Sequence, residues 1–277
     1  MAGASSESLA AALADLETTL PTASLSLARE LFGIVGVLDG SAGLRRALTD
    51  PSREGAEKSA LVRSLLEGKA SAEAVAITAK LAASRWADAR DISDALETLA
   101  STVAIAVAEQ GAGAAGGLSG LERVQNELFA FKSAVEGNHE LQAALTEPQA
   151  TPDAKRALAL RIVPGVSEEG SLLIGQAAAA PRGHRPTALV EKFAALAAAR
   201  QKRWIAEVAV ARELTNAQAG RLQTGLNALY GRDLKINTTV DPQIMGGVRV
   251  TVGDEVLDAS TVARLSELRR QLAAQAR

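Results

Sequence analysis

The chain has 277 residues, of which 47% are hydrophobic, 22% are charged and only 3% are aromatic. This length suits about two domains at roughly 100–200 residues each. The formal net charge of -2 at pH 7 argues against a nucleic-acid-binding protein, because such proteins usually carry a strongly basic face. The absence of cysteine excludes disulfides, thiolate zinc sites and a cysteine nucleophile.

The start of the chain has neither the basic residues nor the apolar segment of a secretory signal peptide, and no run of about 18 apolar residues occurs. We therefore expect a cytoplasmic protein without direct membrane insertion, whose membrane association would depend on a partner. With so few aromatic residues, the core must consist mainly of Ala, Leu, Val and Ile. Because Ala and Leu lose little side-chain freedom in a helix, a mainly α fold is predicted.

Apolar residues at three- and four-residue steps predict amphipathic helices in the first part of the chain. Two stripes come first: Leu9, Leu13, Leu16 and Leu20, then Leu27, Leu31, Ile34, Val35 and Leu38. A short helix over 44–48 is predicted to stop before Pro51, and the next helix, 57–67, is predicted to stop at Gly68. Two further helices are predicted over 72–83 and 91–109.

Two parts of the chain repeat at an offset of 97 residues. Between 30–68 and 127–165, 13 of 39 aligned pairs are identical, where roughly three or four are expected by chance in this composition. Self-similarity at a fixed period indicates two copies of one structural unit. We predict a first helical bundle over 1–115 and a second, duplicated bundle over 116–205.

Gly111, Gly113 and Gly116 match the pattern of a dinucleotide-binding loop. Such a site requires the loop to connect a strand to a helix, so that helix N–H groups meet the pyrophosphate. The preceding residues 103–108 align with 200–205 in the repeat, where a helix continues. A flexible connector between the copies is therefore the preferred interpretation. An enzyme that binds an NAD-type cofactor at Gly111–Gly116 is the alternative function.

The periodicity changes after about residue 205, and a small α+β domain is predicted over 206–277. Strands are predicted at 205–210, 234–240, 248–252 and 255–257, and helices after Thr215 and Ser260. Thr215 and Gln218 form a capping-box pattern, and Gly231 is placed to end that helix. Gly246 and Gly247 precede a strand rather than a helix, so they predict a backbone bulge and not a phosphate-binding loop.

No catalytic, cofactor-binding or metal-binding residues are predicted. The two histidines, His139 and His184, are far apart in the sequence and have no obvious carboxylate cluster beside them. No P-loop, zinc-protease or nucleophile-elbow motif occurs. The sequence therefore favours a structural or binding role.

One group of residues in the last part of the chain forms a specific pattern: Asp241, Pro242, Gly246, Gly247, Gly253, Asp254 and Ser260. This pattern closely resembles the C-terminal signature of the delta subunit of the F-type ATP synthase, the family of the mitochondrial oligomycin-sensitivity-conferring protein. Ala259 stands where the family usually has Gly. Residues 44–61 are similar to the family's N-terminal helical domain, and two such domains resemble the longer actinobacterial form.

The resemblance implies a stator protein without catalytic chemistry. In the family, the helical domain sits on the catalytic head and binds the N-terminal helix of an alpha subunit, while the C-terminal part holds the membrane-anchored b subunit of the peripheral stalk. The implied location is the cytoplasmic side of the cell membrane, as a peripheral part of the complex. The implied role is to resist rotor torque, so that proton flow is coupled to ATP synthesis.

The partner-binding residues are predicted from the leucine stripes. Leu9, Leu13, Leu16, Leu27 and Leu31 are candidates to line a groove for an amphipathic helix of the partner. The same stripes are equally consistent with residues of the protein's own core. A helical adaptor unrelated to the synthase is a further alternative, and the sequence does not distinguish which copy would meet the head.

Overall fold

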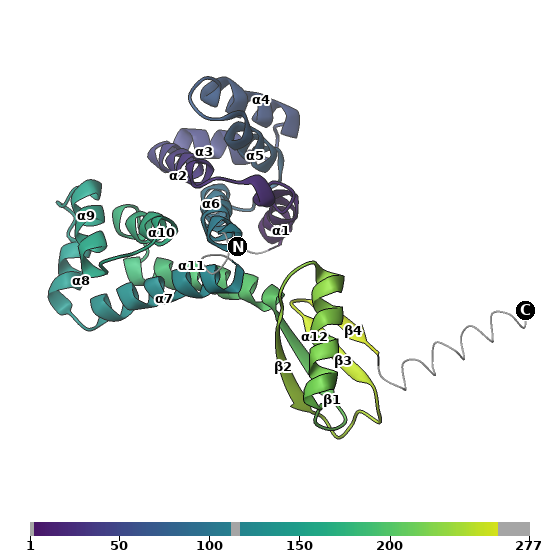
Figure 1. The fold of residues 1–277 in the computed structure, drawn as a ribbon. Coiled ribbons are helices and arrows are strands. Elements are labelled where there is room, and N and C mark those ends of the chain that lie inside the picture. The colour runs from purple at the N-terminus through teal and green to yellow at the C-terminus, as the bar shows by residue number, and fades with distance from the viewer. Residues whose placement is uncertain (1–2, 112–116, 260–277) are drawn as a thin grey trace, which may run out of the picture. The chain divides into compact units, whose positions relative to one another are not determined.

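The computed structural model describes residues 3–111 and 117–259, and the chain forms two compact units, Met1–Ala197 and Ala198–Arg277 (Figure 1). The first unit is helical, and the second contains a four-stranded sheet with one described helix. The predicted fold class, mainly α with a small α+β C-terminal part, is confirmed.

The described helices before the sheet lie close to the predicted segments. They are α1 (Ala4–Leu16), η1 (Leu20–Thr22), α2 (Leu25–Gly40), α3 (Ala42–Thr49), α4 (Gly55–Leu66), α5 (Ala72–Ala83), α6 (Asp91–Gln110), α7 (Gly117–Glu136), α8 (His139–Thr146), α9 (Pro152–Ile162), α10 (Glu168–Ala179) and α11 (Pro186–Gln201). Side-chain caps explain several starts: Ser41 accepts from the Leu44 amide, and Ser71 accepts from the Ala74 amide.

Helices α2 to α6 are followed by α7 to α11, which repeat the same succession of a long helix, three shorter helices and a second long helix. With an offset of 97 residues, α3 coincides with α8 at both ends. Gly68 and Gly165 occupy equivalent turns with positive φ angles of 74° and 75°. In both copies a glycine in the left-handed conformation follows the helix, after α4 in one and after α9 in the other, and prevents the helix from continuing.

Equivalent hydrogen bonds also recur in the two sets of helices. Arg45 donates to the carbonyls of Leu38 and Asp39, and Gln142, 97 residues later, donates to the carbonyls of Val135 and Glu136. Different side chains thus bond to the same carbonyls at the end of a helix, where the next helical turn is not present to supply donors.

Both sets of helices belong to the one compact unit that ends at Ala197. The boundary between the compact units lies at Ala198, and the predicted domain boundaries at 115 and 205 stay predictions. Both sets belong to one unit because α6 packs against α1, α2 and α5 of the first set and against α7 and α10 of the second (Figure 1).

Helix α6 is buried on nearly all sides. Its small residues, such as Ala100, Ala104 and Ala106, allow neighbouring helices to approach closely, and each is at most 1% exposed. Several of its buried hydroxyls bond to carbonyls of the same helix: Ser101 donates to the Glu97 carbonyl at 2.7 Å and Thr102 to the Thr98 carbonyl at 2.8 Å. A helix that is buried nearly all round in this way is typical of a core helix.

A buried ionic cluster joins the two sets of helices. Arg182, in the turn before α11, lies 2.5 Å from Asp39, 2.6 Å from Asp94 and 3.3 Å from Glu97. Lys192 of α11 approaches Glu97 from the other side at 3.3 Å. Burial opposes the charge of Arg182, but Glu97, Asp39 and Asp94 outweigh it and raise the pKa of the guanidinium.

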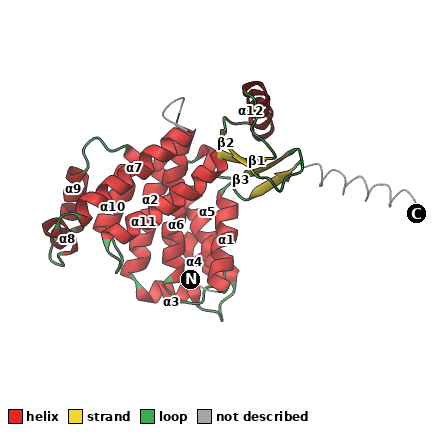
Figure 2. Cartoon of the chain, turned by 90° about the horizontal axis from the view of Figure 1, so that it is seen from below, coloured by secondary structure: helices red, strands yellow, loops and turns green. Residues whose placement is uncertain are grey.

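The second unit is built on strands β1 (Ile205–Val210), β2 (Lys235–Val240), β3 (Val248–Val252) and β4 (Glu255–Asp258), preceded by the turn η3 (Lys202–Trp204) and with α12 (Asn216–Tyr230) between β1 and β2. The strand order is β2-β1-β3-β4, in which only the β1–β2 pair is parallel. A parallel pair needs a crossover, and α12 supplies it while covering one face of the sheet (Figure 2).

Local signals in this unit agree with the structure. The predicted capping box is present, because Thr215 and Gln218 each bond the other's backbone amide, and Gly231 ends α12 with φ of 65°. Val208 and Val250 point to the core beneath Leu226, as strand alternation requires. The helix predicted after Ser260 lies outside the described residues.

Replacing Arg182 by methionine (R182M) leaves the nearly buried Glu97 carboxylate without its arginine. We expect the free energy of unfolding to fall by about 3 kcal/mol, at the lower end for a broken buried ion pair because Lys192 still contacts Glu97. Urea denaturation measures this. The matched control, R185M, removes an exposed arginine three residues away and should change stability by less than about 0.5 kcal/mol. Equal effects of the two variants would contradict the role of the cluster.

Gly253 connects β3 to β4 with φ of 61°, a conformation that costs free energy for any residue with a Cβ. We expect G253A to destabilise the second unit by about 1 kcal/mol. Gly225, inside α12, has open space around an added Cβ, so G225A should instead stabilise by about 0.5–1 kcal/mol. Thermal unfolding followed by circular dichroism distinguishes the signs, and a stable G253A variant would be the contrary result.

Candidate functional site: an apolar groove in the helical unit

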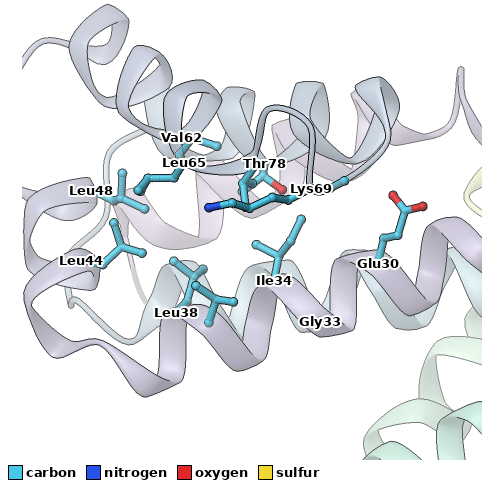
Figure 3. A pocket seen from close by; sticks show the side chains of 13 residues that line it. Glu30, Gly33, Ile34, Leu38, Leu44, Leu48, Val62, Leu65, Lys69 and Thr78 are labelled. Atoms are coloured by element: carbon cyan, nitrogen blue, oxygen red, sulfur yellow. The ribbon is translucent and has the colours of Figure 1, made fainter.

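An apolar groove opens between α2, α3, α4 and α5 of the first helical set (Figure 3). Its cavity volume is about 370 Å³. Its lining is Glu30, Gly33, Ile34, Val37, Leu38, Leu44, Leu48, Val62, Leu65, Leu66, Lys69, Ala70 and Thr78. These residues come from four separate segments, so the groove exists only in the folded protein.

The polar groups of the groove offer no reactive centre. Glu30 accepts a hydrogen bond from the Ser71 amide at 2.8 Å, and the Thr78 hydroxyl donates to the Ala74 carbonyl at 2.8 Å. Lys69 and Glu30 are the charged residues of the lining (Figure 3). Catalysis requires a convergent acid, base or nucleophile, whereas this lining suits the burial of an apolar surface.

Two apolar side chains of the lining are exposed to solvent. Val37, on α2, is 55% exposed, and Leu65, on α4, is 39% exposed. Their exposure costs free energy in the isolated chain, and covering them with a partner's apolar face would recover it. A groove between helices with this lining suits the apolar face of an amphipathic helix.

The five leucines predicted to contact a partner occupy different environments. Leu16, Leu27 and Leu31 are at most 2% exposed and belong to the core. Leu9 and Leu13, on α1, are half-buried. Partner contact by these leucines stays a prediction.

Sequence reasoning missed the groove residues Val37 and Leu65. Val37 lies off the apolar stripe of α2, and Leu65 is one of two adjacent leucines on α4. An apolar residue outside its helix's buried stripe is a usable signal, but the signal does not show that the two residues border one cavity.

The signature residues of the second unit form turns rather than a ligand site. Asp241 accepts from the Gln243 amide at 2.9 Å, and this closes the turn that begins at Pro242. Gly246 and Gly247 have φ angles of 154° and 82° and lead directly into β3. Gly253 and Asp254 form the β3–β4 turn, and Ser260 lies outside the described residues.

The glycine-rich segment does not have the surroundings that a dinucleotide site requires. Residues 112–116 lie outside the described residues, but the segment before them is the end of α6, a helix and not a strand. Among residues 3–111 and 117–259, no group of three or more His, Asp or Glu side chains could hold a metal ion. Within the same ranges, no helix is sufficiently long and apolar to span a membrane.

Comparison with known proteins gives a consistent result. The family model described as the ATP synthase delta (OSCP) subunit matches residues 99–272. Proteins named ATP synthase subunit delta are similar along the full length: that of Pseudarthrobacter chlorophenolicus is 65% identical over 99% of this chain and 100% of its own. The one from Streptomyces coelicolor is 39% identical over 99% of this chain and 98% of its own.

A solved structure also matches, in part. A chain of the Toxoplasma gondii mitochondrial ATP synthase hexamer covers 62% of this chain and 94% of its own, at 16% identity and a TM-score of 0.34. The similarity is too low to carry an argument about geometry. The family model and the full-length relatives are sufficient without it, and they show that the chain belongs to the ATP synthase delta (OSCP) subunit family.

Proposed function

We propose that this chain is a non-catalytic stator subunit, which links the catalytic head of the proton-translocating ATP synthase to the membrane-anchored b subunit. Proton flow is then coupled to ATP synthesis because the head cannot turn with the rotor. Membership in the family supports the assignment of this chain to the ATP synthase complex. The observation that carries the connecting role is the apolar groove, whose lining offers a binding surface without reactive groups.

In this proposal each of the two units binds a different subunit. The helical unit binds the amphipathic N-terminal helix of an alpha subunit, and the groove between α2, α3, α4 and α5 is its proposed docking site. The second unit holds the end of the b subunit. The chain is therefore placed at the cytoplasmic side of the cell membrane, as a peripheral member of the complex.

The match to the family model covers one of the two helical sets and not the other. It begins at residue 99, within α6, and so covers the second set and the sheet but not α1 to α5. The groove is formed entirely by residues 30–78, in the part of the chain before this match. We therefore propose that the first helical set adds a contact to the head, beyond those made by the part of the chain that matches the family model.

The proposal is tested by charging the groove. In V37D/L65D, two carboxylates would have to enter an apolar interface, and we expect the affinity for a synthetic alpha N-terminal peptide to fall at least about 10-fold, which corresponds to about 1.4 kcal/mol. Isothermal titration calorimetry with the full chain measures it.

The matched control is L229D, which places a charge at an exposed leucine of the second unit, 62% exposed. It should leave the affinity for the alpha peptide unchanged. Unchanged affinity in a folded V37D/L65D variant would instead reject the groove as the docking site. Purification of the tagged chain without alpha, beta and b subunits would reject the stator function itself.

A further inference from the structure

A second cavity of the helical unit has the opposite chemistry to the groove. It lies at the start of α4, between the turn over 50–54 and the segment after α5, and has a volume of about 520 Å³. Arg53, Lys58 and Arg85 contribute three cationic groups to its lining, against one carboxylate from Glu54. We call this cavity the basic pocket.

Lys58 makes the basic pocket more than a group of surface cations. The residue is 3% exposed, and its ammonium donates to the Ser84 carbonyl at 2.9 Å. Within the described residues, no carboxylate lies at ion-pair distance from Lys58, Arg53 or Arg85. Burial lowers the pKa of Lys58, and the neighbouring charge of Arg85 lowers it further, although Asp50 opposes this. An added anion would relieve both costs.

The backbone beside the basic pocket also favours an anion. Helix α4 begins at Gly55 without a side-chain cap, whereas α9, its equivalent in the second set, is capped by Thr151, which accepts from the Ala154 amide at 3.2 Å. A Cβ at Gly55 would lie 2.8 Å from the Ala83 carbonyl oxygen, so the backbones pack tightly there. The free amides of a helix N-terminus add a partial positive charge to that of the side chains.

The internal repeat shows what an arginine at this position binds. Arg85 and Arg182 are equivalent at the offset of 97 residues: Arg85 follows α5, and Arg182 follows α10. Arg182 contacts Asp94 and Glu97, two carboxylates about one turn apart on α6, together with Asp39. Arg85 is exposed and has no such carboxylates among the described residues.

We propose that the basic pocket is a docking site for a helical segment of a partner protein that presents two carboxylates one turn apart, with Arg85 binding them as Arg182 binds Asp94 and Glu97. Arg53, Lys58 and the start of α4 supply the remaining positive charge. The inference rests on the proposed function, since the partner is sought among the subunits that hold this chain in the synthase. It adds a second, ionic contact to the apolar one at the groove.

The test uses zero-length cross-linking by a carbodiimide, which joins an amine only to a carboxylate in direct contact. The variant R85K keeps the positive charge and supplies a primary amine in the basic pocket. The matched control R63K supplies one on the exposed face of the same helix as Lys58, outside the pocket lining. Each full-length variant is purified from solubilised membranes by a tag on this chain, cross-linked and analysed by peptide mass spectrometry.

We expect R85K, and not R63K, to give a link from position 85 to an Asp or Glu of a co-purifying protein. A link only to this chain's own Asp50 or Glu54, equal links from both variants, or no link from R85K would overturn the proposal. So would protection of the amine by inorganic phosphate without any partner link, because the pocket would then be a site for free oxyanions. The co-purifying proteins themselves report separately on the stator function: links to a protein from outside the synthase would reject that function and retain the docking site.

Discussion

The helical unit depends on the burial of α6. A helix with one apolar face packs against one layer of neighbours, but α6 contacts helices of both sets and has buried residues on nearly every side. Ser101 and Thr102 fit this environment because their hydroxyls bond to carbonyls of the same helix. Because a single core helix serves both sets, the duplicated segments form one compact unit and not two independently packed bundles.

The ionic cluster around Arg182 and the ring contact between Phe32 and Phe193 lie where the sets meet. The two ring centroids are 6.5 Å apart. A buried ion pair contributes little net stability, since desolvation offsets most of the attraction, but it penalises every arrangement that leaves one charge alone. The cluster is therefore best understood as specifying how the second set packs on the first. A defined junction of this kind is suitable for a proposed connector that must transmit force without deforming.

The two sets have the same helical framework but different surfaces. Arg85 and Arg182 occupy equivalent positions, yet Arg182 is neutralised inside the unit and Arg85 lines an open pocket. The first set also has the apolar groove with its exposed Val37 and Leu65. In the second set Arg182 is used at the junction, whereas the first set keeps an apolar and a basic surface, the two docking sites that we propose.

The features that the sequence predicted correctly are those set by interactions between residues close together in the chain. The helical stripes, the breaks at Gly68 and Gly231, the capping box of Thr215 and the alternating strands depend on neighbours a few residues away, so their pattern is visible in the chain. A leucine stripe does not show whether it meets a partner or the protein's own core, and Leu27 and Leu31 belong to the core. The groove and the Arg182 cluster join segments tens of residues apart. Only the tertiary structure decides these contacts, because they form when helices distant in the sequence pack around the same core.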